Sequence, residues 1–330
     1  MLYLSILAGF VFLFLGGEAL VRGAVALAER LHVSEVLVGL TVVALGTSAP
    51  ELSVSIDAAL KGNPDLAVGN VVGSNIANIL LVLGVTALIH ELRPETRLIM
   101  RDGLFLLAVS VALAALSLTG VLMAAQGFLF LVLLAAYVGY SYWAEEASRS
   151  PAVGRWLDEV EDYRTIPPRF IYAVPLVLAG IAGVILGAEL LVAGAVGLAR
   201  QWGVAEAVIG LSLIAVGTSL PELAVCGVAA FRGRGDVAVG NIIGSNISNT
   251  LGIVGVTALV APLPVAHQIA AYDVWIMVLA TLILIPLLLN GRRLSRSEAA
   301  VFVSLFVLYI ASLYLGAPEF VMERFLPRPV

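Results

Sequence analysis

The chain has 330 residues, of which 61% are hydrophobic and 12% are charged, and its mean hydropathy is +1.04. Soluble domains are about 45–50% apolar and about 25% charged, so this composition excludes a soluble enzyme, a nucleic-acid-binding protein and a disordered scaffold. The single cysteine, Cys226, excludes a disulfide framework and a cysteine-based metal cluster, and the net charge of −5 says little about partners. The composition therefore predicts an integral membrane protein.

Ten apolar segments are long enough to cross a bilayer, since about 20 residues make one helical span. In chain order they cover residues 2–30, 35–60, 65–89, 101–118, 121–142, 169–200, 206–230, 236–260, 268–289 and 298–315. They are continuous apolar runs without the period-two alternation of a transmembrane β-barrel. The sequence thus predicts an all-α polytopic membrane protein with ten transmembrane helices.

The distribution of basic residues predicts the orientation of these spans. If the N-terminus is outside, the cytoplasmic loops hold thirteen Lys and Arg residues and the opposite loops hold four. Positive residues accumulate on the cytoplasmic side of membrane proteins. We therefore expect a multi-pass protein of the cell membrane with both termini outside.

The chain contains an internal repeat. Residues 35–88 align without a gap with 206–259 at an offset of 171, and 30 of the 54 positions are identical. Because each half has five spans, an odd number, the second copy must enter the membrane inverted, as in many secondary transporters. We expect a first inverted repeat at 1–143, a cytoplasmic linker at 144–168 and a second inverted repeat at 169–330.

Each copy places a glutamate, Glu51 or Glu222, in the middle of an apolar helix. An ionised carboxylate inside the membrane costs at least about 2.5–3.5 kcal/mol, so something must compensate its charge. No Lys or Arg lies within a helical turn of either residue. A neutral glutamate bonded to a neighbouring helix is one explanation, but further oxygen-bearing residues in both copies favour a bound cation.

Glycine and proline interrupt the same helices. Pro50 removes a backbone donor and its ring clashes with the carbonyl of Gly46, so the break is expected to leave the carbonyls from Ala44 to Thr47 without helical partners. Such groups are tolerated in the membrane where they line a cavity or meet a ligand. The second copy repeats the arrangement from Ala215 onward.

Hydroxyl and amide side chains accompany each glutamate at helical spacing. The candidate ligands are Thr47, Ser48, Ser74 and Asn78 in the first copy and Thr218, Ser219, Ser245 and Asn249 in the second. Asn75 and Asn246 point elsewhere on their helices, and we expect them to cap backbone or bridge helices rather than to bind the ion, which is the alternative.

The resulting donor set holds two carboxylates, six hydroxyls, two amides and free carbonyls, with no nitrogen or sulfur ligand. Such sets suit hard cations, and Ca²⁺ accepts six to eight oxygens with loose geometry. Two carboxylates balance one Ca²⁺ or two monovalent ions such as Na⁺. Because an uncompensated buried charge costs several kcal/mol, only a loaded site is expected to reorient, which would give antiport.

Two Gly-Thr-Ser-x-Pro-Glu motifs, at 46–51 and 217–222, are each followed by Gly-Ser-Asn, at 73–75 and 244–246. At these residues the sequence resembles the Ca²⁺/cation antiporter superfamily, in particular the prokaryotic sodium/calcium exchanger branch. The resemblance covers both repeats, about 108 of the 330 residues. It implies a central cluster of four helices around the ion sites, and first and sixth spans that slide across it to alternate access.

The resemblance also implies ligands. Glu51 and Glu222 are expected to bind Ca²⁺, helped for Na⁺ or Ca²⁺ by Thr47, Ser48, Ser74, Thr218, Ser219, Ser245 and the carbonyls of Ala44 and Ala215. One departure is Asn249, where some relatives, including the potassium-dependent branch, carry Asp. Asn at both 78 and 249 argues against potassium dependence and leaves the ion stoichiometry open.

We therefore expect a secondary active antiporter that exchanges Ca²⁺ for Na⁺ and expels Ca²⁺. An H⁺/Ca²⁺ exchanger is the alternative within this class, although that branch typically has Gly-Asn in place of Gly-Thr-Ser. A cation channel is the alternative from another class. An enzyme is disfavoured because no histidine lies within a span. The expected partners are Ca²⁺, Na⁺ (or H⁺) and the lipid bilayer, with no cofactor, nucleic acid or protein partner.

Overall fold

The computed structural model describes residues 2–31, 33–147, 170–202, 215–290 and 293–316. Eight of its helices are long and apolar enough to cross a membrane, and a bent helix pair at 35–60 makes a ninth span. The remaining predicted span, 206–230, lies partly outside the described residues. The all-α prediction is confirmed; the strands in the described ranges are two-residue segments, β1 (Val121–Leu122) and β2 (Leu263–Pro264), which pair antiparallel.

The first half of the chain contains α1 (Leu2–Leu31), α2 (Glu35–Val38), η1 (Gly39–Val43), α3 (Ala44–Thr47), α4 (Ala49–Leu60), α5 (Pro64–Ala77), η2 (Asn78–Val82), α6 (Leu83–Ile89), α7 (Thr96–Leu98), η3 (Ile99–Gly103), α8 (Leu104–Ser117) and α9 (Ala124–Ala147). The second half contains α11 (Phe170–Gln201), α13 (Ala215–Gly217), α14 (Leu220–Phe231), α15 (Gly235–Ile247), η6 (Ser248–Ile253), α16 (Val254–Val260), η7 (Ile269–Asp273), α17 (Val274–Asn290) and α18 (Arg296–Tyr314). Segments labelled η are π-helical.

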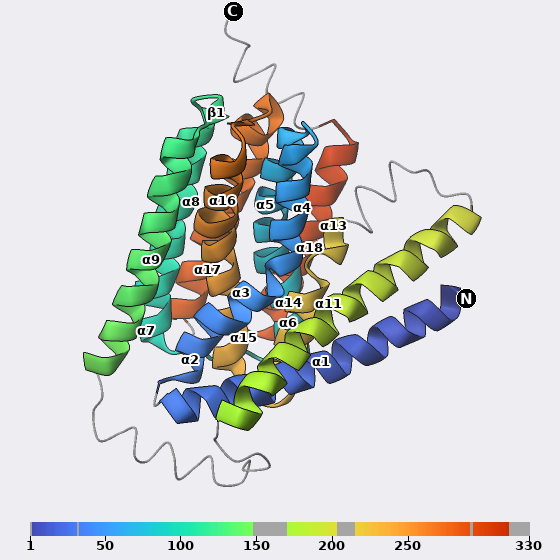
Figure 1. The fold of residues 1–330 in the computed structure, drawn as a ribbon, viewed down its shortest axis with the longest axis vertical. Helices are drawn as coiled ribbons and strands as arrows, with labels where there is room; N and C mark the ends of the chain where they lie inside the picture. Colours follow the sequence, from blue (N-terminus) through green and yellow to red (C-terminus); the bar gives the residue numbers. More distant parts are fainter. Residues whose placement is uncertain (1, 32, 148–169, 203–214, 291–292, 317–330) are drawn as a thin grey trace, which may run out of the picture.

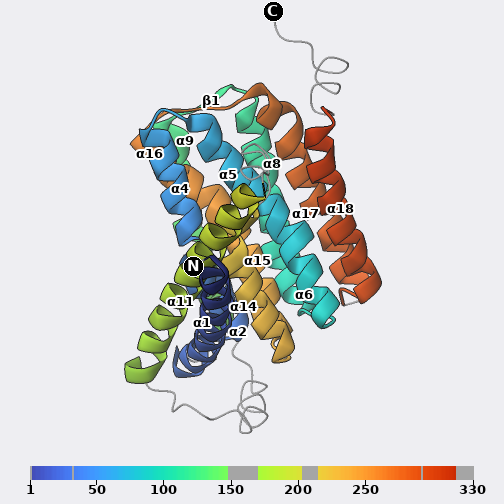
Figure 2. The same ribbon diagram turned by 90° about the vertical axis from the view of Figure 1, so that its right-hand side faces the viewer.

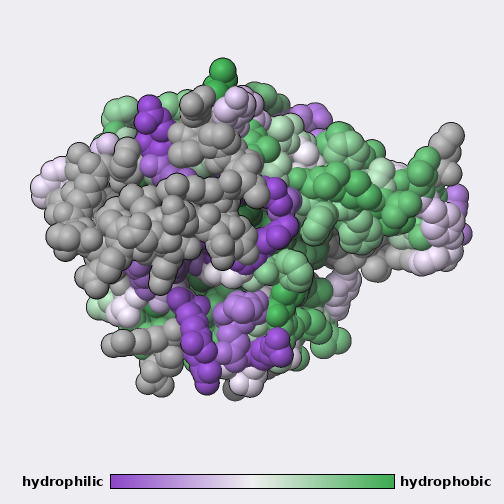
Figure 3. All heavy atoms as spheres, turned by 90° about the horizontal axis from the view of Figure 1, so that it is seen from below, coloured by the Kyte–Doolittle hydropathy of each residue, from purple (hydrophilic) through white to green (hydrophobic). Residues whose placement is uncertain are grey.

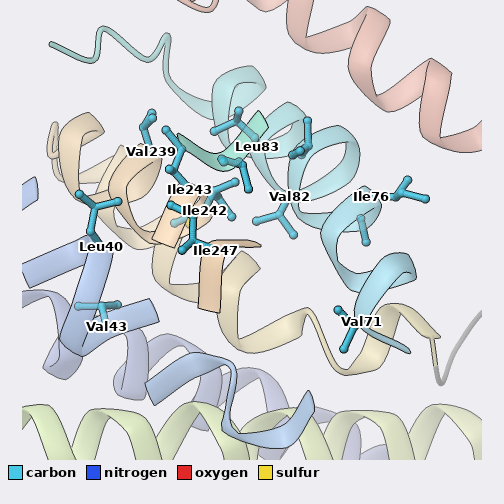
Figure 4. Packing of buried hydrophobic residues seen from close by; sticks show 14 of the residues in the cluster. Leu40, Val43, Val71, Ile76, Val82, Leu83, Val239, Ile242, Ile243 and Ile247 are labelled. Carbon is cyan, nitrogen blue, oxygen red and sulfur yellow. The ribbon is translucent and has the colours of Figure 1, made fainter. Parts of the chain in front are cut away.

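The spans α5–η2–α6 and α15–η6–α16 form the centre of the molecule and are the most buried of those described. The helices α4 and α14 adjoin this centre, and α8, α9, α17 and α18 lie around it (Figure 1). Figure 4 shows Leu40 and Val43 of η1 close to the isoleucines of α15. This approach needs glycine: a Cβ at Gly244 would clash with the backbone of Leu40.

The long helices α1 and α11 pack against each other along their length, on one side of the other helices (Figures 1 and 2). A Cβ at Gly9 would lie 2.7 Å from the backbone nitrogen of Leu191, and one at Gly23 would lie 2.8 Å from that of Val177. The residue numbers rise along α1 as they fall along α11, so these equivalents in the two halves run antiparallel. This is the relation expected of inverted copies.

Glycines make that close packing possible. They recur every seven residues on both helices, at Gly9, Gly16 and Gly23 and at Gly180, Gly187 and Gly194, and the two sets are themselves 171 residues apart. In membranes, small residues of this kind let helix backbones approach closely.

The lower end of the molecule, seen in Figure 3, gathers hydrophilic side chains around the segment drawn in grey, whereas the arm that projects to the right, where Figure 1 places the ends of α1 and α11, is mostly hydrophobic. Two ion pairs join segments far apart in the sequence: Arg234 pairs with the buried Glu35 at 2.8 Å, and Arg293 lies 3.2 Å from Glu91. The polar end and the apolar arm suit water and lipid, respectively.

Candidate cation-binding site

Both glutamates of the repeated motif lie in the first turn of a half-helix. The helices Glu35–Thr47 and Ala49–Leu60 meet at an angle of 43°, and the junction residue Ser48 has φ −82° and ψ 7°. Ser219, at the start of α14, has nearly the same conformation, with φ −88° and ψ 5°. Pro50 and Pro221 are the second residues of α4 and α14, in the first turn, where a missing N–H is tolerated. The predicted break is therefore a sharp bend.

One detail of that prediction is wrong. The carbonyl of Ala44 accepts the backbone N–H of Ser48 at 3.0 Å, and the hydroxyl of Thr47 lies 3.3 Å from it. The N–H that Pro50 lacks would have bonded to the carbonyl of Gly46, four residues earlier. The carbonyl of Ala44 therefore keeps its own helical partner. In the second copy the N–H of Ser219 donates to Val216 at 3.1 Å instead, and Ala215 is the first residue of α13.

The structure brings the two repeats together at Glu222. This carboxylate is fully buried, and its Oε1 accepts hydrogen bonds from Ser48 at 3.2 Å and from Ser245 at 3.5 Å. Glu51 is also fully buried, one turn after Ser48, whose hydroxyl contacts Glu222. The two acids are therefore candidates for one site built from both copies.

The hydroxyl residues extend this cluster. Thr47 Oγ1 lies 3.5 Å from Ser245 Oγ and 3.4 Å from the side-chain oxygen of Asn241. Ser74 is buried on α5, one turn before Asn78, and Ser219 is buried at the start of α14. Thr218 is half-buried in the turn between α13 and α14. Asn241 was not among the predicted ligands, although it sits one turn before Ser245.

Several oxygens of the cluster are buried without a hydrogen-bond partner. They are both oxygens of Glu51, Oε2 of Glu222, Oδ1 of Asn78, Oδ1 of Asn249 and Oγ of Ser219. A buried acceptor without a donor costs about 1–3 kcal/mol, and more when it is charged. Carboxylate and amide oxygens can only accept, so a cation is the ligand that would satisfy them together.

The donor set is that of a hard-cation site. Within the described ranges, no three His, Cys, Asp or Glu residues gather as they would around a transition metal. The two carboxylates are instead supplemented by hydroxyls and amides. Asn75 and Asn246, which were expected to cap backbone or bridge helices, bridge α5 and α15: each donates to the other's backbone carbonyl, at 3.3 and 3.2 Å.

Sequence reasoning missed a second pair of membrane acids, Asp102 and Asp273, which obey the same offset of 171. Asp102 is fully buried and accepts hydrogen bonds from Arg101 at 2.8 Å and from Tyr137 at 3.0 Å. Asp273 accepts one from Tyr309 at 3.0 Å. These carboxylates have protein donors, so they anchor helices. The offset itself was the signal that could have found them.

The chain is similar to known proteins along nearly its full length. A family model described as "Sodium/calcium exchanger protein" matches residues 1–143 and 172–315. The "Putative antiporter CaxA" of Alkalimonas amylolytica is 38% identical over 92% of this chain and 96% of its own. The "Sodium/calcium exchanger MaX1" of Methanosarcina acetivorans is 32% identical over 94% of this chain and 98% of its own.

A solved structure agrees with the fold. The sodium-calcium exchanger NCX_Mj, soaked with 2.5 mM Na⁺ and 0.1 mM Ca²⁺, superimposes with a TM-score of 0.79 at 32% identity, covering 94% of this chain and 97% of that one. The expected architecture of ten transmembrane helices in two inverted repeats is therefore confirmed, and the protein is a transporter rather than an enzyme. The chain belongs to the sodium/calcium exchanger family, whose members are membrane proteins that carry out cation/Ca²⁺ antiport.

Proposed function

We propose that this protein exchanges Ca²⁺ for Na⁺ by alternating access and works in the direction of Ca²⁺ efflux. One observation supports this most strongly: two carboxylates from inverted copies, Glu51 and Glu222, are buried together, and three of their four oxygens have no hydrogen-bond partner. The ions bind to these oxygens and to the hydroxyls and amides around them. The solved relative, at 32% identity, is named as a sodium-calcium exchanger.

The charge of the site accounts for the coupling. Without ions, two like charges share a medium of low dielectric constant, where an unpaired charge costs several kcal/mol. One Ca²⁺ neutralises both carboxylates, and so do two monovalent ions. The loaded site crosses the occluded state and the empty one does not, so each outward Ca²⁺ is matched by returning Na⁺.

The ligand set of the proposal comprises Glu51, Glu222, Thr47, Ser48, Ser74, Asn78, Thr218, Ser219, Ser245, Asn249 and the carbonyls of Ala44 and Ala215. Four of these residues, Thr47, Ser48, Ser245 and Glu222, are linked by contacts of 3.5 Å or less. For Ala44 to bind an ion, the hydroxyl of Thr47 would turn away from its carbonyl.

The experiment is Ca²⁺ uptake into proteoliposomes loaded with Na⁺, with the pH clamped on both sides. The Na⁺/Ca²⁺ proposal expects uptake that follows the Na⁺ gradient. Uptake that instead follows a pH gradient in Na⁺-free medium would establish the H⁺/Ca²⁺ alternative, in which protons replace Na⁺ on the two glutamates. Unitary currents in planar bilayers would establish a channel.

A further inference from the structure

Two asparagines tie the central helices together. Asn75 and Asn246 are related by the repeat offset of 171, both are fully buried, and their mutual bonds are reciprocal: the side-chain nitrogen of each donates to the backbone carbonyl of the other. Equivalent groups that bind each other in this way are related by an approximate two-fold axis that passes between them.

The same two side chains also bind the amides of the candidate site. Asn249 donates from Nδ2 to Oδ1 of Asn75 at 3.1 Å, and Asn78 donates from Nδ2 to Oδ1 of Asn246 at 3.0 Å. The other branch of each amide, Oδ1 of Asn78 and of Asn249, is buried without a hydrogen-bond partner. Because an amide is planar, holding its nitrogen on one side fixes its oxygen on the other.

We propose that Asn75 and Asn246 are positioning residues that aim the amide oxygens of Asn249 and Asn78 at the bound cation. The inference rests on the proposed function. It also explains why residue 249 is an amide. The Nδ2 of Asn75 already donates to Asn246 and to Thr250 Oγ1 at 2.9 Å, so only the Oδ1 of Asn75 faces residue 249. A carboxylate at position 249 would therefore place its oxygen against Oδ1 of Asn75, which is another acceptor.

The test is equilibrium Ca²⁺ binding, by titration calorimetry, to the purified full chain. Asn75→Leu and Asn246→Leu are each expected to weaken Ca²⁺ binding about 10- to 100-fold, as is typical when a group that orients a metal ligand is lost. Thr250→Val is the matched control, because it removes a bond from the same Nδ2 but leaves the contact between Asn75 and Asn249. This variant is expected to keep the affinity of the unmodified chain.

A purely structural role would lower the melting temperature of all three variants and leave their Ca²⁺ affinity unchanged, which would overturn the inference. Asn249→Asp provides a test that does not require the leucine variants to fold. Despite its added charge it is expected to bind Ca²⁺ no more tightly, and tighter binding would also overturn the inference. If the unmodified chain binds no Ca²⁺, the proposed function fails instead.

A different observation concerns an ion pair between α1 and the end of α14. The Glu18 carboxylate accepts hydrogen bonds from Arg232, at 2.6 and 3.0 Å, and from Arg22 at 2.6 Å. The repeat equivalents of Glu18 and Arg232 are Glu189 and Lys61, again an acid and a base.

That second pair is not formed. Lys61 bonds to Asp57 on its own helix at 2.7 Å, and Glu189 is exposed. The helices α14 and α4, which carry the two pairs, also differ in burial. Val225 of α14 is fully buried, whereas its repeat equivalent on α4, Val54, is 38% exposed. The α1–α11 pair thus lies along α14 more closely than along α4.

We infer that the two pairs form a latch in which one closes as the other opens. Exchanging the conformations of inverted repeats turns one access state into the other, and this exchange replaces Glu18–Arg232 by Glu189–Lys61. The closed pair stabilises the present state and the other pair stabilises the opposite one. The inference rests on the proposed function, since antiport requires both states.

The test measures a distance in the full chain, with spin labels at Leu186 of α11 and Leu60 of α4, both exposed, in a Cys226→Ala background. The two labels come closer when the α1–α11 pair lies along α4. Glu18→Gln is expected to increase the population with this shorter distance, and the matched variant Glu189→Gln is expected to decrease it. Since partly exposed ion pairs contribute about 0.2–1 kcal/mol, the ratio of populations should change up to about fivefold. Shifts in the same direction, or none in either variant, would overturn the latch. Transport by the unmodified chain is measured separately and tests the proposed function.

Discussion

The two site carboxylates differ in their surroundings. Oε1 of Glu222 accepts hydrogen bonds from hydroxyls of both repeats, whereas neither oxygen of Glu51 has a hydrogen-bond partner. Glu51 therefore depends most on the ion. The motif predicted both residues, but it could not predict this difference. Ser48 is three residues from Glu51 in the sequence, yet its hydroxyl donates to Glu222 of the other repeat.

Neutralising either acid should abolish Ca²⁺ binding without unfolding the protein. In Glu51→Gln and Glu222→Gln, the repulsion between two buried charges is relieved, so the ion-free melting temperature should stay or rise, while its increase on adding Ca²⁺ should disappear. Asp65→Asn, which neutralises an exposed acid of α5, should keep that increase. A Ca²⁺-dependent increase retained in either Gln variant would contradict the proposed ligands.

At the scale of elements, breakers and apolar length predicted the spans well: the expected helix at 268–289 is described as Ile269–Leu289. The π-helical segments escaped prediction. Four of the five described segments form repeat-related pairs, η2 with η6 and η3 with η7, and one pair begins at or beside Asn78 and Asn249. Tertiary packing causes these segments, because the wider turn of a π-helix must fit the side chains of the neighbouring helices. The local sequence alone does not encode it.

The glycine contacts predict that α1 and α11 tolerate no side chain between them. In Gly187→Leu, the new Cβ would lie 2.6 Å from the backbone of Leu13, so one helix must move. Overpacking of this kind costs about 1–3 kcal/mol and should lower the melting temperature. Gly139→Leu, on α9, is the control, because its Cβ would meet nothing within 4 Å. Equal melting temperatures for the two variants would contradict tight α1–α11 packing.

For the whole molecule, inversion followed from counting: five spans per half force the second copy to enter upside down. The antiparallel α1 and α11 agree with that count. The packing of helices around the centre could not be predicted by counting spans. It depends on how side chains of the two repeats fit together, as Gly244 and Leu40 do. The membrane orientation rests on charge alone.

That orientation can be measured in intact cells. In a Cys226→Ala background, Asn63→Cys should react with a membrane-impermeant thiol reagent added outside, because the turn after α4 is predicted to face out. Ser297→Cys, at the start of α18, should react only after the membrane is permeabilised. Both positions are exposed, so access by water is comparable. The reverse pattern would place the termini in the cytoplasm.

The central claim is that Glu51 and Glu222 hold Ca²⁺ and Na⁺ alternately in one site. Ca²⁺ flux into Na⁺-loaded proteoliposomes at clamped pH tests it most directly, with Glu51→Gln and Glu222→Gln measured beside the unmodified chain. The account predicts Na⁺-dependent uptake in the unmodified chain and none in either variant. Substantial uptake in either variant, or uptake by the unmodified chain without any counter-ion, would contradict it.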